Sequence, residues 1–514
     1  MVGPGASLLR ALIAALTTTL ILLALLPSGA AAAAPAGDEA AAGQAPPPNV
    51  VTIVTDDQTL EQYKESVMPQ TMAKLGAKGT TFSQAITSTP QCCPSRAGYL
   101  TGQYAHNNGV IANRPGYPLL KRKKDVLPAW LHAAGYRTLH VGKYLNGYSE
   151  EDGLRKAPGW DRWVTMVEAD YTKPGYSFDG KYRQPNEFLT TLNNETSVKL
   201  IDRYAPSKQP FYLQVDQFAP HVGSGAEGGR CDGGAVPAPQ DTNLFTDATA
   251  PVDPATTEDD VSDKPEFIRR VPALTDLSKI DLRYGCALAS LASVDRGVSQ
   301  IVGALRRSGE LGNTMIIFTS DNGYAYAEHR MPLSKGLPYE EHVRVPLVIR
   351  PPRSFPKRFR EGATLDAPVA NIDLAPTILG LTHSDPCREN GVCRRMDGRT
   401  LLPLLRGATP GWTKKRAVMT SFSVNFKAYR RSCVWDGFRT PTLSVIEHLE
   451  LPEPGGALCR PAAEYEVYDL ATDPFQLDNA APPSEAEMER LRSLQDCTGI
   501  RGRDPKRDGR PFCE

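Results

Sequence analysis

The sequence predicts an α/β fold in which a largely parallel sheet is sandwiched between helices, followed by a smaller α+β domain. Short runs of β-branched and aliphatic residues alternate with stretches of helical spacing, the pattern expected of strands buried on both faces. Polar or ionisable residues follow four of the predicted strands within a few positions. After about Leu405 the alternation gives way to Trp-, Cys- and turn-rich segments, which predicts a second domain.

The predicted elements begin after Asn49. Residues 50–55 form an unbroken β-branched run typical of a buried strand, and residues 68–78 have helical spacing that Gly79 ends. Residues 223–264 are rich in Gly, Pro, Asp and Thr and predict a long loop that is either functional or mobile. Further strands are predicted at residues 137–141, 211–215, 315–319 and 345–349, and further helices at residues 127–134, 288–306 and 484–494. Residues 466–470 are a further segment of the smaller domain.

The first residues have the pattern of a secretory signal peptide. Arg10 precedes an apolar run over residues 11–26, and Pro, Ser and an alanine string follow it. A retained membrane anchor is the weaker interpretation, because this run is shorter than the ~20 residues that a spanning helix needs. We therefore expect residues 1–34 to be removed on export, residues 35–48 to form a disordered linker, and no stable membrane insertion afterwards.

Length and charge limit the remaining possibilities. A chain of 514 residues with 41% hydrophobic content can build a large core, and we expect a main domain over residues 49–405 and a smaller one over residues 406–514. Lys plus Arg and Asp plus Glu both number 58, so the chain has no net positive charge that would attract nucleic acid or an anionic bilayer. Any binding of anions must therefore depend on a local cluster of cationic side chains. The basic run 121–124 is either a solvated loop or a patch for an anionic glycan.

The cysteines agree with export. Apart from the adjacent pair Cys92 and Cys93, the ten cysteines leave an even number that disulfides could use. Proximity in sequence favours pairing of 387 with 393, 433 with 459 and 497 with 513, which leaves 231 and 286 for a longer loop. The sequence alone leaves this connectivity open.

The polar residues after the strands predict one composite site. In open α/β sheets ligands bind beyond the carboxyl ends of the strands, so residues hundreds of positions apart can converge there. A polar strand end is unremarkable alone, but four together favour a shared site. The residues concerned are Asp56, Asp57, Lys143, His221, Asp321 and Asn322.

Residues 92–102, which read Cys-Cys-Pro-Ser-Arg-Ala-Gly-Tyr-Leu-Thr-Gly, are the most specific signal in the chain. They match the signature C-x-P-S-R followed by L-T-G, and on this match the chain resembles the formylglycine-dependent sulfatases of the alkaline phosphatase superfamily. The segment Gly-Lys-Tyr-Leu-Asn at 142–146 is similar to the N-acetylglucosamine-6-sulfatase and extracellular sulfatase branch. A vicinal disulfide, a metal-ligand pair or two buried thiols are the simpler readings of Cys92 and Cys93.

The resemblance implies that a maturation enzyme reads the unfolded motif and oxidises Cys92 to formylglycine, while Cys93 occupies a variable position. The hydrate of an aldehyde carries two hydroxyls on one carbon, so one can attack sulfur and the other can later expel sulfate. Covalent catalysis of this kind splits one difficult displacement into two easier steps.

The resemblance also implies a divalent metal held together with Cys92. The four other ligands would be oxygen donors, which suit Ca²⁺, or Mg²⁺, better than zinc. The ion would polarise a sulfate oxygen and stabilise the ionised hydrate. The implied ligands are Asp56, Asp57, Asp321 and Asn322.

Four cationic or titratable residues match the remaining catalytic positions of the family. Arg96 would hold the hydrate oxygen, Lys143 would contact sulfate, and Lys335 would bind sulfate or assist the leaving group. His221, in Ala-Pro-His, could donate a proton to the departing alkoxide. Many arylsulfatases have a histidine where this chain has Leu145, so one acid/base candidate is missing.

The resemblance covers residues 49–405, the implied catalytic domain, and it predicts a secreted hydrolase of a sulfated sugar or an aryl sulfate. A phosphonate monoester or phosphodiester hydrolase would use the same site, and comparison of sulfate and phosphonate esters would separate the two. A metal-dependent glycan-binding protein without turnover is a third possibility. Binding alone, however, needs no aldehyde precursor.

Overall fold

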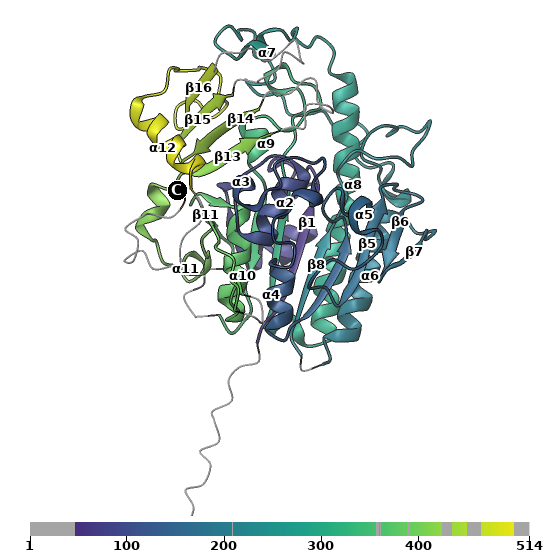
Figure 1. The fold of residues 1–514 in the computed structure, drawn as a ribbon. Helices are drawn as coiled ribbons and strands as arrows, with labels where there is room; N and C mark the ends of the chain where they lie inside the picture. The colour runs from purple at the N-terminus through teal and green to yellow at the C-terminus, as the bar shows by residue number, and fades with distance from the viewer. Residues whose placement is uncertain are drawn as a thin grey trace, which may run out of the picture. The chain divides into compact units, whose positions relative to one another are not determined.

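A mixed ten-stranded sheet is the centre of the computed structural model (Figure 1). Its strand order is β11-β2-β10-β9-β1-β8-β4-β5-β6-β7, and the central strands β9, β1, β8, β4 and β5 are mutually parallel. Strand β10 is antiparallel to β9, and β6 and β7 continue antiparallel beyond β5. The strands are β1 Asn49–Thr55, β2 Thr80–Phe82, β4 Arg137–Gly142, β5 Arg162–Glu168, β6 Gly175–Phe178, β7 Lys181–Arg183, β8 Phe211–Asp216, β9 Thr314–Ser320, β10 Leu347–Arg350 and β11 Ala363–Leu365.

The structure describes residues 47–514 except 208, 356–358, 360, 388–390, 424–433, 450–463, 498–512 and 514. The predicted signal peptide and nearly all of the predicted linker lie outside the described residues. Residues from Pro46 onward belong to one compact unit. The domain boundary after residue 405 stays a prediction.

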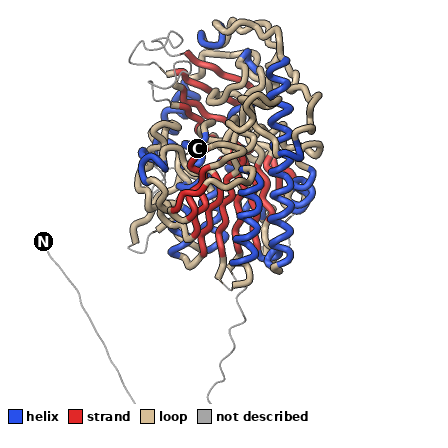
Figure 2. The backbone as a smooth tube through the Cα atoms, turned by 90° about the vertical axis from the view of Figure 1, so that its right-hand side faces the viewer, coloured by secondary structure: helices blue, strands red, loops and turns tan. Residues whose placement is uncertain are grey.

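Helices cover both faces of the large sheet, as the tube drawing shows (Figure 2). Alternate residues of β1 point to opposite faces, so Val50 and Val54 join one hydrophobic cluster while Val51 and Ile53 join another. Helices α2, α4 and α10 contribute to the first cluster, and α6 and α8 contribute to the second, together with Met68 and Leu75, which flank α1. The helices are α1 Pro69–Lys74, α2 Cys92–Thr101, α3 Ala105–Asn108, α4 Leu127–Ala133, α5 Tyr148–Asp152, α6 Leu189–Tyr204, α7 Glu266–Arg269, α8 Ser278–Arg307, α9 Glu340–Val343, α10 Leu374–Thr382, α11 Leu402–Leu405 and α12 Glu485–Gln495.

A small antiparallel sheet follows in the C-terminal part of the chain, with the order β13-β14-β15-β16. Its strands are Val418–Phe422, Trp435–Arg439, Leu443–His448 and Glu464–Asp469. Helix α12 packs against it and begins with a capping box, in which Ser484 and Glu487 bond each other's backbone N–H groups. Strands β3, Ala85–Ile86, and β12, Val369–Ala370, form a separate parallel pair. The predicted fold class is confirmed.

Several predicted boundaries shift. Helix α8 begins at Ser278, ten positions before the predicted start, because Ile280, Tyr284 and Ala287 continue its buried stripe toward the N-terminus. The strand predicted at 345–349 is observed at Leu347–Arg350, directly after Pro346, which has no N–H to donate to a ladder.

The described residues form three disulfides, Cys231–Cys286, Cys387–Cys393 and Cys497–Cys513, and these match two of the predicted pairs near in sequence and the remaining pair of 231 with 286. Residues 433 and 459 lie outside the described residues. In the part of the chain that the structure describes, no helix combines the length and the apolarity that spanning a membrane would require.

Candidate active site

Four neighbouring strands bring the predicted site residues together at one edge of the sheet. Because β9, β1, β8 and β4 are adjacent and parallel, the segments that follow them emerge side by side. Helix α2 and the loop that follows the 3₁₀ turn at Glu328–Arg330 complete the site. The residues delivered by the strands are Asp56 and Asp57 from β1, Lys143 from β4, His221 from β8, and Asp321 and Asn322 from β9.

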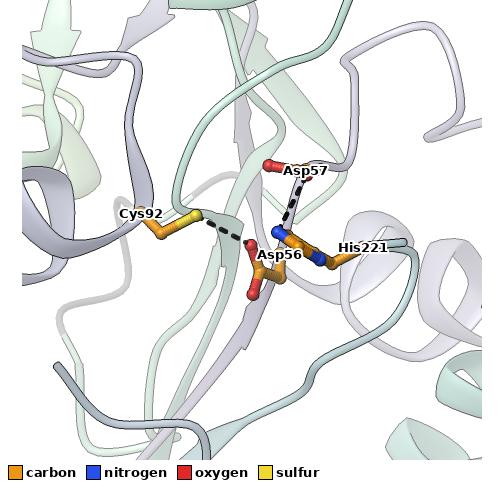
Figure 3. A group of neighbouring side chains, drawn as sticks. All are labelled: Asp56, Asp57, Cys92 and His221. Atoms are coloured by element: carbon orange, nitrogen blue, oxygen red, sulfur yellow. Dashed lines mark hydrogen bonds and ion pairs between the residues drawn. The ribbon is translucent and has the colours of Figure 1, made fainter. Parts of the chain in front are cut away.

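Cys92 is the first residue of α2, and its side chain faces the carboxylates (Figure 3). All ten residues of this helix are buried, and Gly102 ends it in the left-handed conformation. The Cys92 thiol donates to Asp56 Oδ1 at 3.3 Å, and Lys335 Nζ donates to Cys92 Sγ at 3.0 Å. The helix therefore fixes the cysteine between an anion and a cation.

Arg96 lies one turn further along α2 and is shared by several carboxylates. Its Nε donates to Asp321 Oδ2 at 2.7 Å, and an Nη lies 3.2 Å from Asp216 Oδ1. Asp56 Oδ2 lies 3.8 Å from the other Nη. The guanidinium is 2% exposed. Arg96 therefore links the carboxylates at the ends of β1, β8 and β9.

The two aspartates after β1 have different cationic partners. Lys143 Nζ binds Asp56 Oδ2, whereas Lys335 Nζ binds Asp57 Oδ1 at 2.5 Å. His221 Nε2 lies 3.7 Å from Asp57 Oδ2, and its Nδ1 lies 2.6 Å from the carbonyl oxygen of Val222. The site is thus a compact network of alternating charge.

Burial and these charges shift the pKa values in opposite directions. Burial alone would raise the pKa of Asp56, but Lys143 and the other cations outweigh it and hold that pKa well below the usual range. Burial and then the nearby Asp56 raise the pKa of Asp321 to about 6. Burial and then Lys335 lower the pKa of His221. Burial, followed by the charge of Asp56, raises the pKa of the Cys92 thiol to about 12, so a cysteine here is a neutral thiol.

The oxygen donors fit a hard divalent cation. Asn322 Nδ2 donates to Asp57 Oδ1 at 2.6 Å, but the buried Asn322 Oδ1 has no hydrogen-bond partner among the described residues. Ligand atoms of Asp56, Asp57, Cys92 and His221 lie within 4.8 Å of one another. The predicted ligand Asp321 is not part of that group; Arg96 binds its Oδ2 and backbone N–H groups bind its Oδ1. Carboxylate and amide oxygens are ligands suited to Ca²⁺ and Mg²⁺.

Asp216 is a site residue that the sequence analysis missed. It ends β8, pairs with Arg96, and accepts a bond from the ring of His140 at 3.0 Å and from Gln214 Nε2 at 2.5 Å. No motif surrounds it. The available signal was an aspartate at the end of an apolar strand, the same signal that singled out Asp56 and Asp321.

Comparison with known proteins places the chain in a family. The sulfatase family model matches residues 48–384, and the model described as N-sulphoglucosamine sulphohydrolase, C-terminal, matches residues 327–495. Human N-acetylglucosamine-6-sulfatase is 32% identical over 497 residues, which is 88% of this chain and 85% of that protein. The extracellular sulfatase SULF-1 homolog of Drosophila melanogaster is 31% identical over 370 residues, 69% of this chain but 31% of that longer protein.

A solved structure with the same fold is described as a complex with its substrate, D-glucosamine-2-N,6-O-disulfate. It has a TM-score of 0.70 and 22% identity, covering 87% of this chain and 96% of that one. The chain belongs to the sulfatase family. It is a sulfuric ester hydrolase, as the resemblance at residues 92–102 predicted.

Proposed function

We propose that this protein is a secreted sulfatase that releases sulfate from a sulfated sugar, with formylglycine at position 92 and a divalent cation in the site. One observation carries the proposal: the signature cysteine, Cys92, is buried at the start of α2 in contact with Asp56 and Lys335. Burial and the Asp56 carboxylate raise the pKa of this thiol, which makes a free cysteine a poor nucleophile when no metal is bound.

A sugar sulfate is the substrate class that the relatives favour. The human and Drosophila relatives carry the names of N-acetylglucosamine-6-sulfatase and extracellular sulfatase, and the solved neighbour holds a glucosamine disulfate. The segment Gly-Lys-Tyr-Leu-Asn at 142–146 supports the same branch.

The Cys92 thiol stands where the aldehyde hydrate would be. The hydrate would supply a hydroxyl nucleophile that can also release its product. The cation, Ca²⁺ or Mg²⁺, would be held by Asp56, Asp57, Asp321 and Asn322 and would supply Lewis-acid stabilisation of negative charge. Asn322 Oδ1, which lacks a partner among the described residues, supports this ligand set.

The chain's cations have separate tasks in this proposal. Arg96 holds the carboxylates in place and offsets charge at the nucleophile, and Lys143 and Lys335 bind the sulfate oxygens. His221, at the outer side of the site and 23% exposed, donates a proton to the departing sugar oxygen. Its lowered pKa means that this donation weakens as the pH rises.

Export and maturation complete the proposal. The signal pattern over residues 1–34, three disulfides and the extracellular relative support secretion. A formylglycine-generating maturation enzyme would act before folding, because Cys92 is only 1% exposed in the folded protein. We further propose residues 49–405 as the catalytic domain and residues 406–514 as a smaller C-terminal domain.

The test combines mass spectrometry with a substrate panel. We expect an aldehyde or its hydrate at Cys92 and an ordinary thiol at Cys93 in active protein. Cys92→Ala should abolish sulfate release while the circular dichroism spectrum and metal content stay near those of the unaltered protein. Cys93→Ala is the matched control: Cys93 is equally buried and adjacent, and it should retain activity.

The panel contains sulfated glucosamines, an aryl sulfate and a phosphonate monoester. Sugar sulfates should be hydrolysed with the highest kcat/KM, and activity should track the fraction of aldehyde rather than total protein. Full activity with unmodified Cys92 would refute the aldehyde. Faster hydrolysis of the phosphonate would favour the phosphonate hydrolase, and binding without turnover of any compound would favour a glycan-binding protein.

A further inference from the structure

A second pocket adjoins the candidate active site and is lined by cations. It has a volume of about 200 Å³ and includes Asp57 on its wall, so it opens onto the site itself. Lys279 and Arg283 of α8 also line the pocket, together with Tyr324 and Tyr326. None of the sequence motifs singled out these four residues.

The charges in this pocket are unbalanced. Among its described lining residues, Asp57 is the sole carboxylate, and it already binds Lys335 and the side-chain amide of Asn322. Lys279 and Arg283 have no carboxylate partner among the residues that the structure describes. Since the whole chain has a formal net charge of +0, the excess of positive charge here is a local feature that favours an anion.

The Arg283 guanidinium is held in position by the loop that faces it. One Nη donates to the backbone carbonyl of Asp232, and the disulfide between Cys231 and Cys286 ties the same loop to α8. A Cβ at Gly234 would lie 2.8 Å from the guanidinium, so only glycine leaves space for it. These contacts preorganise the cation and reduce the entropy that binding would cost.

The start of helix α8 presents both cations to the pocket. Lys279 and Arg283 are four residues apart and therefore lie on one face, and Ala287 extends that face into the pocket wall. Lys279 lies in the first turn of α8, where the helix dipole also favours negative charge, and Arg283 lies in the second turn. The part-buried ring of Tyr324 offers a flat surface beside them for a sugar ring.

We propose that this pocket is a second anion subsite, in which Arg283 and Lys279 bind an additional sulfate or carboxylate on the sugar whose sulfate ester is cleaved. The inference rests on the proposed function and deepens it, because it makes the substrate a sugar with at least two anionic groups. Arg283 and Lys279 are binding residues that determine specificity. They do not touch the reacting sulfur.

Binding to the inactive Cys92→Ala protein tests the subsite without turnover. The probes are N-acetylglucosamine 6-sulfate with one anion, glucosamine 2-N,6-O-disulfate with two, and a disaccharide of a hexuronic acid and 6-sulfated glucosamine, whose second anion is a carboxylate. Titration calorimetry should show tighter binding of one or both two-anion sugars, and the two probes distinguish sulfate from carboxylate. Arg283→Gln in the Cys92→Ala protein should reduce the ratio of affinities for the two-anion and one-anion sugars about 10-fold. This is the lower end of the range expected for loss of a charge-assisted hydrogen bond.

Kinetics of the aldehyde-bearing enzyme give an independent readout. The ratio of kcat/KM for the preferred two-anion sugar to that for the one-anion sugar should fall about 10-fold in Arg283→Gln and by a smaller factor in Lys279→Gln. Arg307→Gln is the matched control. Arg307 is a surface arginine of the same helix, pairs with Asp202, and lies about 36 Å away at 1.5 Å per residue.

Three results would overturn the subsite. The preference ratio could be unchanged in Arg283→Gln, the unaltered pocket could bind all three sugars with equal affinity, or it could bind none of them. Failure of the proposed function is a separate result: the aldehyde-bearing enzyme would release no sulfate from any sugar. Gly234→Ala keeps both cations but displaces the guanidinium. It should lower the preference ratio in the same direction as Arg283→Gln, and an unchanged ratio there would show that the placement of Arg283 is irrelevant.

Discussion

Replacing Arg96 with Gln removes the cation that three buried carboxylates share. Asp56 keeps Lys143, and Asp216 keeps His140 and Gln214. Asp321 is affected most, because its Oδ2 loses its 2.7 Å partner and only backbone N–H groups at Oδ1 remain. Because the pKa of Asp321 is about 6 even beside Arg96 and rises without it, the buried carboxyl group is then either an unpaired charge or must bind a proton at neutral pH.

The expected loss follows from the burial of both partners. Arg96 and Asp321 are 2% and 0% exposed at their side chains, so solvent cannot replace the missing charge. Removal of one partner from a buried pair costs about 3–5 kcal/mol. With an unfolding entropy of about 2 cal/mol/K per residue, a body of this size should lose about 3–5 °C in Tm.

The assay is thermal unfolding in the presence of a chelator, which keeps metal binding from contributing. Arg416→Gln is the control, since Arg416 is equally buried and paired with Asp373 away from the site. Both variants should be destabilised, but only Arg96→Gln should lose sulfatase activity. The double variant Arg96→Gln/Asp321→Asn should regain about 2 kcal/mol over the single variant, because it removes the unpaired charge.

Two results would refute this reasoning. A Tm of Arg96→Gln within 1 °C of the unaltered protein (well under the ~3–5 °C expected) would mean that water or rearrangement compensates the carboxylates. A double variant no more stable than Arg96→Gln would mean that lost packing, rather than an uncompensated charge at Asp321, causes the destabilisation.

Three further predictions concern metal, proton transfer and pH. Asp321→Ala should remove bound divalent metal and activity together; elemental analysis checks this, and retained metal with full turnover would disprove the assignment. His221→Ala should slow sugar sulfates much more than activated aryl sulfates, whose phenolate hardly needs a proton; equal losses in kcat would exclude His221 as the acid. Burial raises the pKa of Asp397 to about 7, so its folded form binds a proton more tightly than the unfolded chain. It should add up to about 4 kcal/mol at pH below 4, lost as the pH rises to 7; Asp397→Asn should flatten this part of the Tm profile, and an unchanged profile would contradict it.

The sequence was sufficient for the elements that local pattern determines. The unbroken β-branched run within β1 and the helical spacing of α4 are local properties, and both elements are observed within one or two residues of their predicted limits. The order β9-β1-β8-β4 is not local. It depends on which helices cover which face, so a reading of spacing could place Asp56 and Asp321 at strand ends without giving their distances.

The site residues likewise divide into those that local sequence patterns identify and those that depend on tertiary contacts. The motif at residues 92–102 and the strand ends identified residues that the structure brings together, although their catalytic roles remain proposals. Asp216 was missed because its importance comes from Arg96, which reaches it from another element. Arg283 was missed because its position depends on a loop tied to α8 by a disulfide. Contacts of this kind exist only after the chain has folded.

The central position of β1 in the sheet determines when its strand pairings can form during synthesis and folding. Strand β1 is synthesised first but pairs with β8, about 160 residues later, and with β9, which ends at Ser320. Pairings between such distant segments form slowly. Cys92 contacts Lys335, which is synthesised later still, so its surroundings are complete only near the end of folding. We expect the thiol to stay accessible until then, so the length of that interval should limit how much of the protein a thiol-modifying enzyme can reach before folding is complete.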